Sequence, residues 1–88
     1  MANISKVYPV FMIFYDHAST SSWMTRTELE SFKPELIYQV GWLVNEDDQC
    51  YRVSGQVCQE NGDVGDTMVI LKSTVTHFEK LKIKIPNV

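Results

Sequence analysis

The chain has 88 residues, of which 44% are hydrophobic and 22% charged, and its formal net charge is −3. A chain of this length buries only about 60–65% of its unfolded surface, so we expect a single domain, residues 1–88, supplemented by assembly into a homo-oligomer. The acidic total argues against long DNA or RNA as a partner, but it leaves room for a small anionic ligand that needs two or three local cations.

The setting predicted by the sequence is the reducing, soluble interior of a cell. Cys50 and Cys58 are too few for a disulfide framework and lack the close spacing of a zinc or redox pair. The first ten residues lack the basic head and apolar stretch of a signal peptide, and the longest apolar run, residues 10–15, is too short to span a bilayer. We therefore expect a cytoplasmic protein with no membrane contact and no cofactor.

The first predicted strand covers residues 6–15, which are rich in β-branched and aromatic side chains. The polar stretch "DHASTSSW", residues 16–23, follows at once. Thr25 and Glu28 then form a capping-box pattern, which predicts a helix of about two turns that ends before Pro34.

The rest of the chain reads as short strands separated by tight turns. Asn61-Gly62 is its strongest hairpin signal. In the third strand the alternation predicts that Tyr51 and Val53 point inward and Ser54 outward. The four remaining strands are expected at residues 36–48, 50–59, 67–72 and 81–85. Small curled antiparallel sheets close to remove their exposed edges, so we predict a mostly β, five-stranded SH3-like or Sm-like barrel with one short helix.

Catalytic motifs are sparse. An acid–base phosphodiesterase would use two His-x-Ser/Thr motifs; His17-Ala18-Ser19 matches one, but the second histidine, His77, is followed by Phe78 and Glu79. There is no spaced set of metal ligands, no nucleophile elbow, no Walker loop and no dinucleotide fingerprint. We expect neither an enzyme nor a metal site.

Two explanations exist for Trp23, which follows four hydroxyl side chains at residues 19–22. Its ring would provide a stacking platform for a nucleobase. Alternatively, it would be the hydrophobic staple that leads into the helix, with the serines as caps. The residues alone favour the staple, because caps are common and base platforms are rare.

Lys72, Ser73 and Thr74 follow an apolar strand and offer a cation and two hydroxyl groups to a phosphate. The alternative is an ordinary solvated turn. His17, beside Asp16, would either orient a ligand or belong to an exposed loop pair.

Three segments together resemble a family of short bacteriophage proteins: "HASTSSW", "VGWLVNEDDQCYRVS" and "GDTMVILKSTVTHFEKL". The resemblance runs from about Asp16 to Leu81. This chain departs from the family pattern at Leu71-Lys72, which stands in place of a Pro-Lys step.

The family includes sponge proteins that bind the cyclic oligonucleotide signals of the CBASS antiphage defence, such as cyclic GMP–AMP, without cleaving them. The resemblance implies that Trp23 or Tyr15 stacks on a base, that Ser19 and Ser22 contact base edges or ribose, and that Lys72 with Arg26 meets phosphate. The full set of expected ligand-binding residues is Tyr15, His17, Ser19, Ser22, Trp23, Arg26, Lys72 and Thr74. A cyclic di- or trinucleotide has repeated halves, so a homo-oligomer would supply the second half of the site.

Two other functions stay open. A small barrel with exposed Tyr, Trp and Met side chains would bind and inhibit a host protein. A more distant alternative is a cyclic-nucleotide hydrolase that works through His17.

Overall fold

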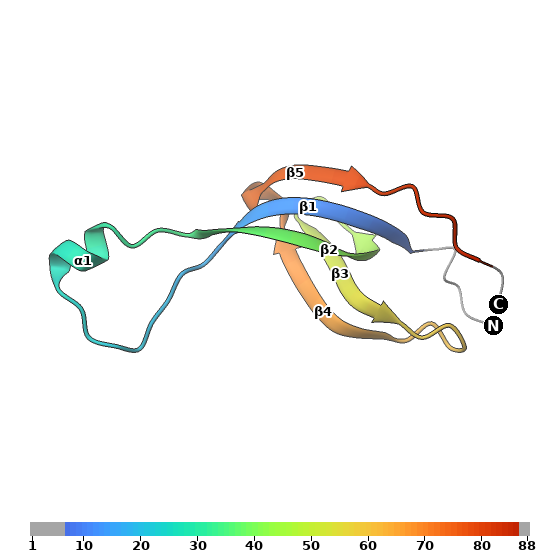
Figure 1. Cartoon of the computed structure of the whole chain (residues 1–88), viewed down its shortest axis with the longest axis horizontal. Coiled ribbons are helices and arrows are strands. Elements are labelled where there is room, and N and C mark those ends of the chain that lie inside the picture. The colour runs from blue at the N-terminus through green and yellow to red at the C-terminus, as the bar shows by residue number, and fades with distance from the viewer. Residues whose placement is uncertain (1–6, 87–88) are drawn as a thin grey trace.

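The computed structural model describes residues 7–86. One antiparallel sheet contains the five strands β1 (Tyr8–Asp16), β2 (Glu35–Glu46), β3 (Cys50–Val57), β4 (Val64–Leu71) and β5 (Val75–Lys80). The five-residue helix α1 (Arg26–Glu30) lies between β1 and β2, and the 3₁₀ turn η2 (Lys72–Thr74) joins β4 to β5 (Figure 1). The predicted mostly β fold, with a short helix after the first strand, is confirmed.

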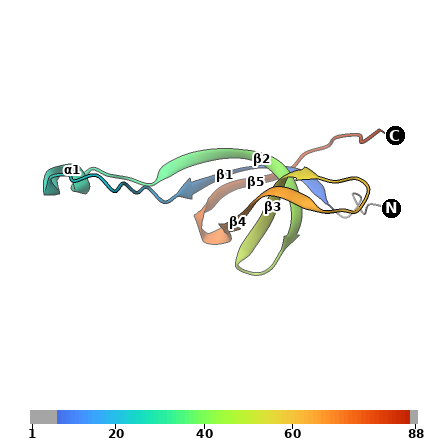
Figure 2. The same cartoon turned by 90° about the horizontal axis from the view of Figure 1, so that it is seen from below.

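The sheet is curled but open. Its strand order is β4-β3-β2-β1-β5, so β4 and β5 are its two edges, yet only the three residues of η2 join them. The edges converge at η2 and splay apart toward the other end of the sheet (Figure 1, Figure 2). Because β4 and β5 are not paired with each other, the sheet is not closed, and the predicted SH3-like or Sm-like barrel is not confirmed.

The core lies inside the curl. Alternate residues of β1 point inward, and they meet apolar side chains from β2, β3 and β4. The rings of Tyr51 on β3 and Phe78 on β5 stack with centroids 4.5 Å apart, although two strands separate β3 from β5 in the sheet. The buried hydrophobic residues are Val10, Met12, Phe14, Leu43, Val53 and Ile70.

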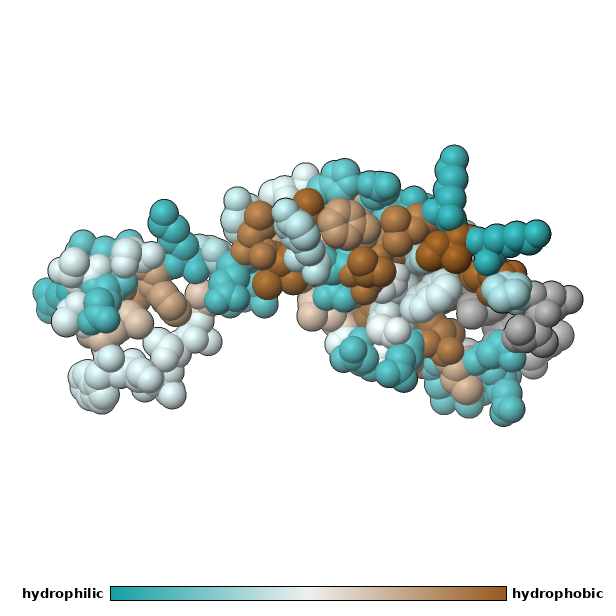
Figure 3. Space-filling view, viewed as in Figure 1, coloured by the Kyte–Doolittle hydropathy of each residue, from teal (hydrophilic) through white to brown (hydrophobic). Residues whose placement is uncertain are grey.

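The outer face of the sheet is also apolar, but it is uncovered. Tyr38 and Val40 on β2 are exposed, beside the half-buried Phe11 and Ile13 of β1. Figure 3 shows a band of hydrophobic residues across the sheet. The two apolar faces of β2 agree with its central place between β1 and β3.

The two hairpin turns of β2–β3 and β3–β4 follow their local sequence. Gly62 has a φ of 78°, the left-handed conformation that favours glycine, so the Asn61-Gly62 prediction is confirmed. In the other turn, the Asp47 carboxylate accepts hydrogen bonds from the backbone N–H groups of Gln49 and Cys50, at 2.8 Å each. These bonds, with a further one from Arg52, lower the pKa of Asp47.

The last strand was predicted in the wrong place. It covers Val75–Lys80, directly after the 3₁₀ turn η2, whereas the sequence predicted it at residues 81–85. Residues 81–85 form no strand, and Ile83 and Ile85 are exposed. The register between β1 and β5 shifts at Ile13/Phe14, and this irregularity interrupts the two-residue alternation in β5 that marks a strand in a sequence.

Ser54 was predicted to point outward into solvent, which is wrong: the residue is only 2% exposed. It lies opposite Trp42 in the register of β2 and β3. Within residues 7–86 its hydroxyl oxygen has no hydrogen-bond partner. A buried polar group in this state destabilises a fold by about 1–3 kcal/mol.

Ser54→Ala is therefore expected to raise the free energy of unfolding by about 1 kcal/mol, because it removes a buried hydroxyl and leaves almost no cavity. Urea denaturation monitored by circular dichroism measures this change. Ser73→Ala, at an exposed serine, is the matched control and should change stability by less than about 0.5 kcal/mol. A loss of stability in Ser54→Ala would show that the hydroxyl is satisfied in solution.

Candidate functional site

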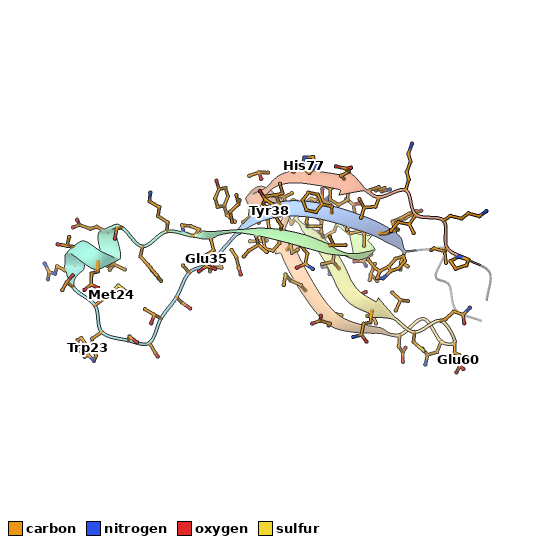
Figure 4. All side chains as sticks on the ribbon, in the orientation of Figure 1. Trp23, Met24, Glu35, Tyr38, Glu60 and His77 are labelled. Atoms are coloured by element: carbon orange, nitrogen blue, oxygen red, sulfur yellow. The ribbon has the colours of Figure 1, made fainter. Side chains whose placement is uncertain are left out.

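An arm, defined here as residues 17–34, separates the candidate residues into groups. The ladder between β1 and β2 ends at the pair Asp16 and Glu35, and the chain beyond it projects away from the sheet (Figure 1, Figure 4). The predicted ligand residues on the arm are Ser19, Ser22, Trp23 and Arg26. Those beside the sheet are Tyr15 at the end of β1, His17 at the base of the arm, and Lys72 and Thr74 in η2.

The structure brings Tyr15, His17 and Thr74 together. They line one hollow of about 220 Å³ between the end of β1, the end of β4 and η2; we call it the base hollow. Its other lining residues are Phe14, Asp16, Met68, Val69, Ile70 and Leu71. The base hollow thus combines an apolar wall with an imidazole, a carboxylate and a hydroxyl group at positions far apart in the sequence.

Hydrogen bonds between residues close in the sequence position Thr74 and His17 beside this hollow. The Thr74 hydroxyl donates a hydrogen bond of 2.7 Å to the Leu71 carbonyl, which fixes the turn that joins β4 to β5. The backbone N–H of His17 donates to the Asp16 carboxylate at 2.9 Å, which fixes the point where the chain leaves β1. The imidazole of His17 is exposed.

Lys72 lies outside the base hollow. Its ammonium group is 2.6 Å from a carboxylate oxygen of Glu46 and lies over the ring of Tyr51, 4.9 Å from the centroid. The hydrogen bond to Glu46 raises the pKa of Lys72 above its ordinary value. A phosphate bound by Lys72 would have to compete with Glu46, so this lysine is less available to an anion than the sequence suggested.

The capping box predicted at the start of the helix is present. The Glu28 backbone N–H donates to the Thr25 hydroxyl at 3.1 Å, and the Thr25 backbone N–H donates to the Glu28 carboxylate at 3.0 Å. The latter bond lowers the pKa of Glu28. The helix is shorter than the two turns expected, since it ends at Glu30 with Ser31 as its C-cap.

Trp23 is not the hydrophobic staple of this helix. Its side chain is fully exposed, whereas the half-buried Met24 stands directly before the Thr25 cap. Met24 lines a second hollow, of about 260 Å³, together with Leu29 four residues after the cap, which is the pairing of a staple. The sequence favoured Trp23 as the hydrophobic staple of this helix. Met24 holds that position instead, and Trp23 projects into solvent (Figure 4).

This second hollow, which we call the arm hollow, brings together two more of the predicted residues. Ser19 and Ser22 line it with Ala18, Thr20, Met24, Leu29 and Phe32. Trp23 and Arg26 are on the same arm but do not line it. The eight candidate residues thus fall into a base group, an arm group and Lys72: three of them line the base hollow, two line the arm hollow, and Lys72 lines neither.

An acidic pair at the base of the arm is not apparent from the sequence. Asp16 and Glu35 are directly opposite each other in the register, and like charges in this position repel. The contribution of β4, residues 68–71, to the base hollow is equally hidden in the sequence. No short sequence motif predicts either feature, because both depend on where β1 pairs with β2 and on the curl of the sheet.

In the described part of the chain, no three His, Cys, Asp or Glu side chains gather as ligands for a metal ion. His77 lies on β5, where its Nε2 is 3.0 Å from a carboxylate oxygen of Glu79, and His17 lies at the base of the arm. Of the helices in residues 7–86, none is long and apolar enough to cross a membrane.

Comparisons of the chain with models of protein families, with curated proteins and with solved structures find no match.

Proposed function

We propose that this protein is a non-enzymatic phage anti-defence protein that binds a cyclic oligonucleotide immune signal, such as cyclic GMP–AMP, in the cytoplasm of the infected host and holds it without cleaving it. The observation that carries the proposal is the base hollow, where three of the expected ligand residues, Tyr15, His17 and Thr74, meet from separate parts of the chain. The resemblance of the sequence to phage sponge proteins supplies the ligand class.

The composition of the base hollow suits one half of such a ligand. Ligand pockets commonly have volumes of about 300–1,000 Å³. The base hollow, at about 220 Å³, is large enough for one base with part of its ribose but not for a whole cyclic dinucleotide. A nucleobase has apolar faces and polar edges, which match an apolar wall bordered by Asp16, His17 and Thr74. A second copy of the chain would hold the other half of the ligand.

The curled sheet is the scaffold of this site. We infer that it is an SH3-like or Sm-like barrel left open between β4 and β5. Support comes from the stacking of Tyr51 on Phe78 across the inside of the curl and from the convergence of both edges at η2. The base hollow lies beside this point of convergence, where Leu71 and Thr74 both line it.

The test is the thermal melting of the purified protein with a panel of cyclic di- and trinucleotides. A ligand at 100 times its dissociation constant is expected to stabilise the fold by about 2.7 kcal/mol, a shift easily seen in so small a domain. Boiling the complex and analysing the supernatant by mass spectrometry should return the nucleotide intact. A nucleotide recovered as linear product would contradict sequestration and favour hydrolysis.

His17→Ala is expected to weaken binding of the responding nucleotide about two- to tenfold, because a hydrogen bond to a neutral base edge contributes about 0.5–1.5 kcal/mol. His77→Ala is the matched control: this second exposed imidazole is on β5 and does not line the base hollow. Isothermal titration calorimetry measures both affinities. Equal affinities for the two variants would exclude the base hollow as the site, even if a nucleotide binds elsewhere.

One observation favours the alternative, a module that binds a host protein. The arm exposes Trp23, Leu29 and Phe32, side chains that commonly anchor protein–protein contacts. The absence of any nucleotide shift, combined with a stable complex with one identified host protein, would favour this alternative.

A further inference from the structure

The polar groups that border the base hollow are mainly hydrogen-bond acceptors. The Thr74 hydroxyl donates its one proton to the Leu71 carbonyl at 2.7 Å, so its oxygen can only accept from a ligand. A carboxylate such as that of Asp16 accepts hydrogen bonds and has none to donate. The remaining polar side chains of the lining, Tyr15 and His17, can each donate or accept. The hollow therefore has fixed acceptors and no fixed donor among its side chains.

The Asp16 carboxylate has one oxygen in use and one available. Its Oδ1 accepts the backbone N–H of His17 at 2.9 Å, which holds the carboxylate at the point where the chain leaves β1. For Oδ2, no hydrogen bond or ion pair is reported within residues 7–86. Because Asp16 lines the base hollow, a bound molecule can reach this second oxygen.

The charge around the base hollow disfavours a phosphate inside it. Asp16 is directly opposite Glu35 in the β1–β2 register, which places two acids side by side. No lysine or arginine lines the hollow: Lys72 lies outside it, 2.6 Å from Glu46, and Lys33 is on the arm. An uncharged base is therefore favoured in the hollow, and the phosphates of the same ligand would lie outside it.

We propose that the base hollow selects guanine over adenine and that Asp16 is the residue that reads the base. This inference rests on the proposed function, since it names the base that the protein would hold. The Watson–Crick edge of guanine presents two adjacent donors, the N1–H and the 2-amino group. Adenine presents one donor, its 6-amino group, beside the N1 atom, which accepts.

The acceptors of the hollow match the guanine edge. A carboxylate accepts from two neighbouring N–H groups at once, so Asp16 pairs with both donors of guanine. The imidazole of His17 is then free to donate to O6 or N7 of the same base. With adenine, the lone pair of N1 faces a carboxylate oxygen, and both acceptors stay without a donor. A site built to bond an N–H group rejects an analogue that lacks it, because its own polar group is left unpaired.

The experiment is isothermal titration calorimetry of the full chain with cyclic di- and trinucleotides that carry only guanine, only adenine or only hypoxanthine. Hypoxanthine keeps the N1–H of guanine and lacks its 2-amino group. The wild type is expected to bind the guanine ligand at least about tenfold more tightly than the adenine ligand of the same ring size, which is the effect of one hydrogen bond to a charged group. The hypoxanthine ligand should fall between them.

Asp16→Asn tests the residue itself. The carboxamide oxygen can keep the hydrogen bond from the His17 N–H, and an NH₂ group then replaces the available Oδ2. Since a donor takes the place of an acceptor, affinity for the guanine ligand should fall at least about tenfold, while affinity for the adenine ligand stays the same or rises. Glu35→Gln is the matched control: it removes the charge opposite Asp16 but does not line the hollow, and it should keep the wild-type ratio. Thermal melting without nucleotide shows whether both variants are folded.

Equal affinity of the wild type for the guanine and adenine ligands, or a preference for adenine, overturns this inference and leaves the proposed function standing. The same holds for a guanine preference that Asp16→Asn leaves unchanged, because the base is then read elsewhere, and for an equal loss with both bases. A wild-type protein that binds none of these ligands overturns the proposed function together with the inference.

Discussion

Met12→Ala is expected to destabilise the fold by about 2–5 kcal/mol. Met12 is 0% exposed, and it lies on β1 between β2 and β5 at the centre of the buried cluster. Domains of this size have a free energy of unfolding of roughly 4–13 kcal/mol, so the loss would be a large fraction of the total. Thermal and urea denaturation should show a melting temperature lower by about 10 °C or more.

Met24→Ala is the matched control for Met12→Ala. It removes the same side chain from the arm, where Met24 packs in the arm hollow and not in the core of the sheet. We expect its melting temperature to change by less than about 4 °C at concentrations where the protein is monomeric. A loss as large as that of Met12→Ala would mean that arm and sheet unfold as one unit, and would contradict the description of the arm as a separate projection.

The strands were predictable from the sequence where one side chain in two is buried without interruption. β1 shows this alternation, and the turn at Asn61-Gly62 identifies its own conformation. The last strand was misplaced because its pairing with β1 contains a register shift, while the regular alternation of residues 81–85 lies outside the sheet. The two-residue alternation along β3 predicts that Ser54 is exposed, as it would be on a flat strand. In this curled sheet the residue is buried.

The candidate site was predictable only in its local parts. The capping box of Thr25 and Glu28 follows from four residues, and it formed as expected. That Thr74 lines the same hollow as His17 depends on the curl of the sheet, which no short motif encodes. That the β1–β2 ladder stops at Asp16 and Glu35, which makes the following residues an arm, depends equally on the packing of the whole domain.

Trp23→Ala is expected to weaken nucleotide binding by about tenfold or more while leaving the fold of the chain intact. The resemblance implies that this exposed ring stacks on a base; such stacking contributes about 1–3 kcal/mol, and about 1.4 kcal/mol corresponds to a factor of ten in the dissociation constant. Because Trp23 is fully exposed, its removal costs the single chain no packing. Isothermal titration calorimetry measures the affinity, and thermal melting without nucleotide measures the stability of the fold.

The comparison with Tyr8→Ala decides what Trp23 does. Tyr8 is a half-exposed aromatic residue at the start of β1, the end of the strand away from the arm, where its ring contacts the ammonium group of Lys80. Truncating it should leave nucleotide binding unchanged even if stability falls slightly. Loss of binding in Trp23→Ala alone, with partial recovery in Trp23→Phe, identifies a base platform that works by its ring. If Trp23→Ala binds the nucleotide like the wild type, the ring is not a base platform, and its full exposure favours a protein partner instead.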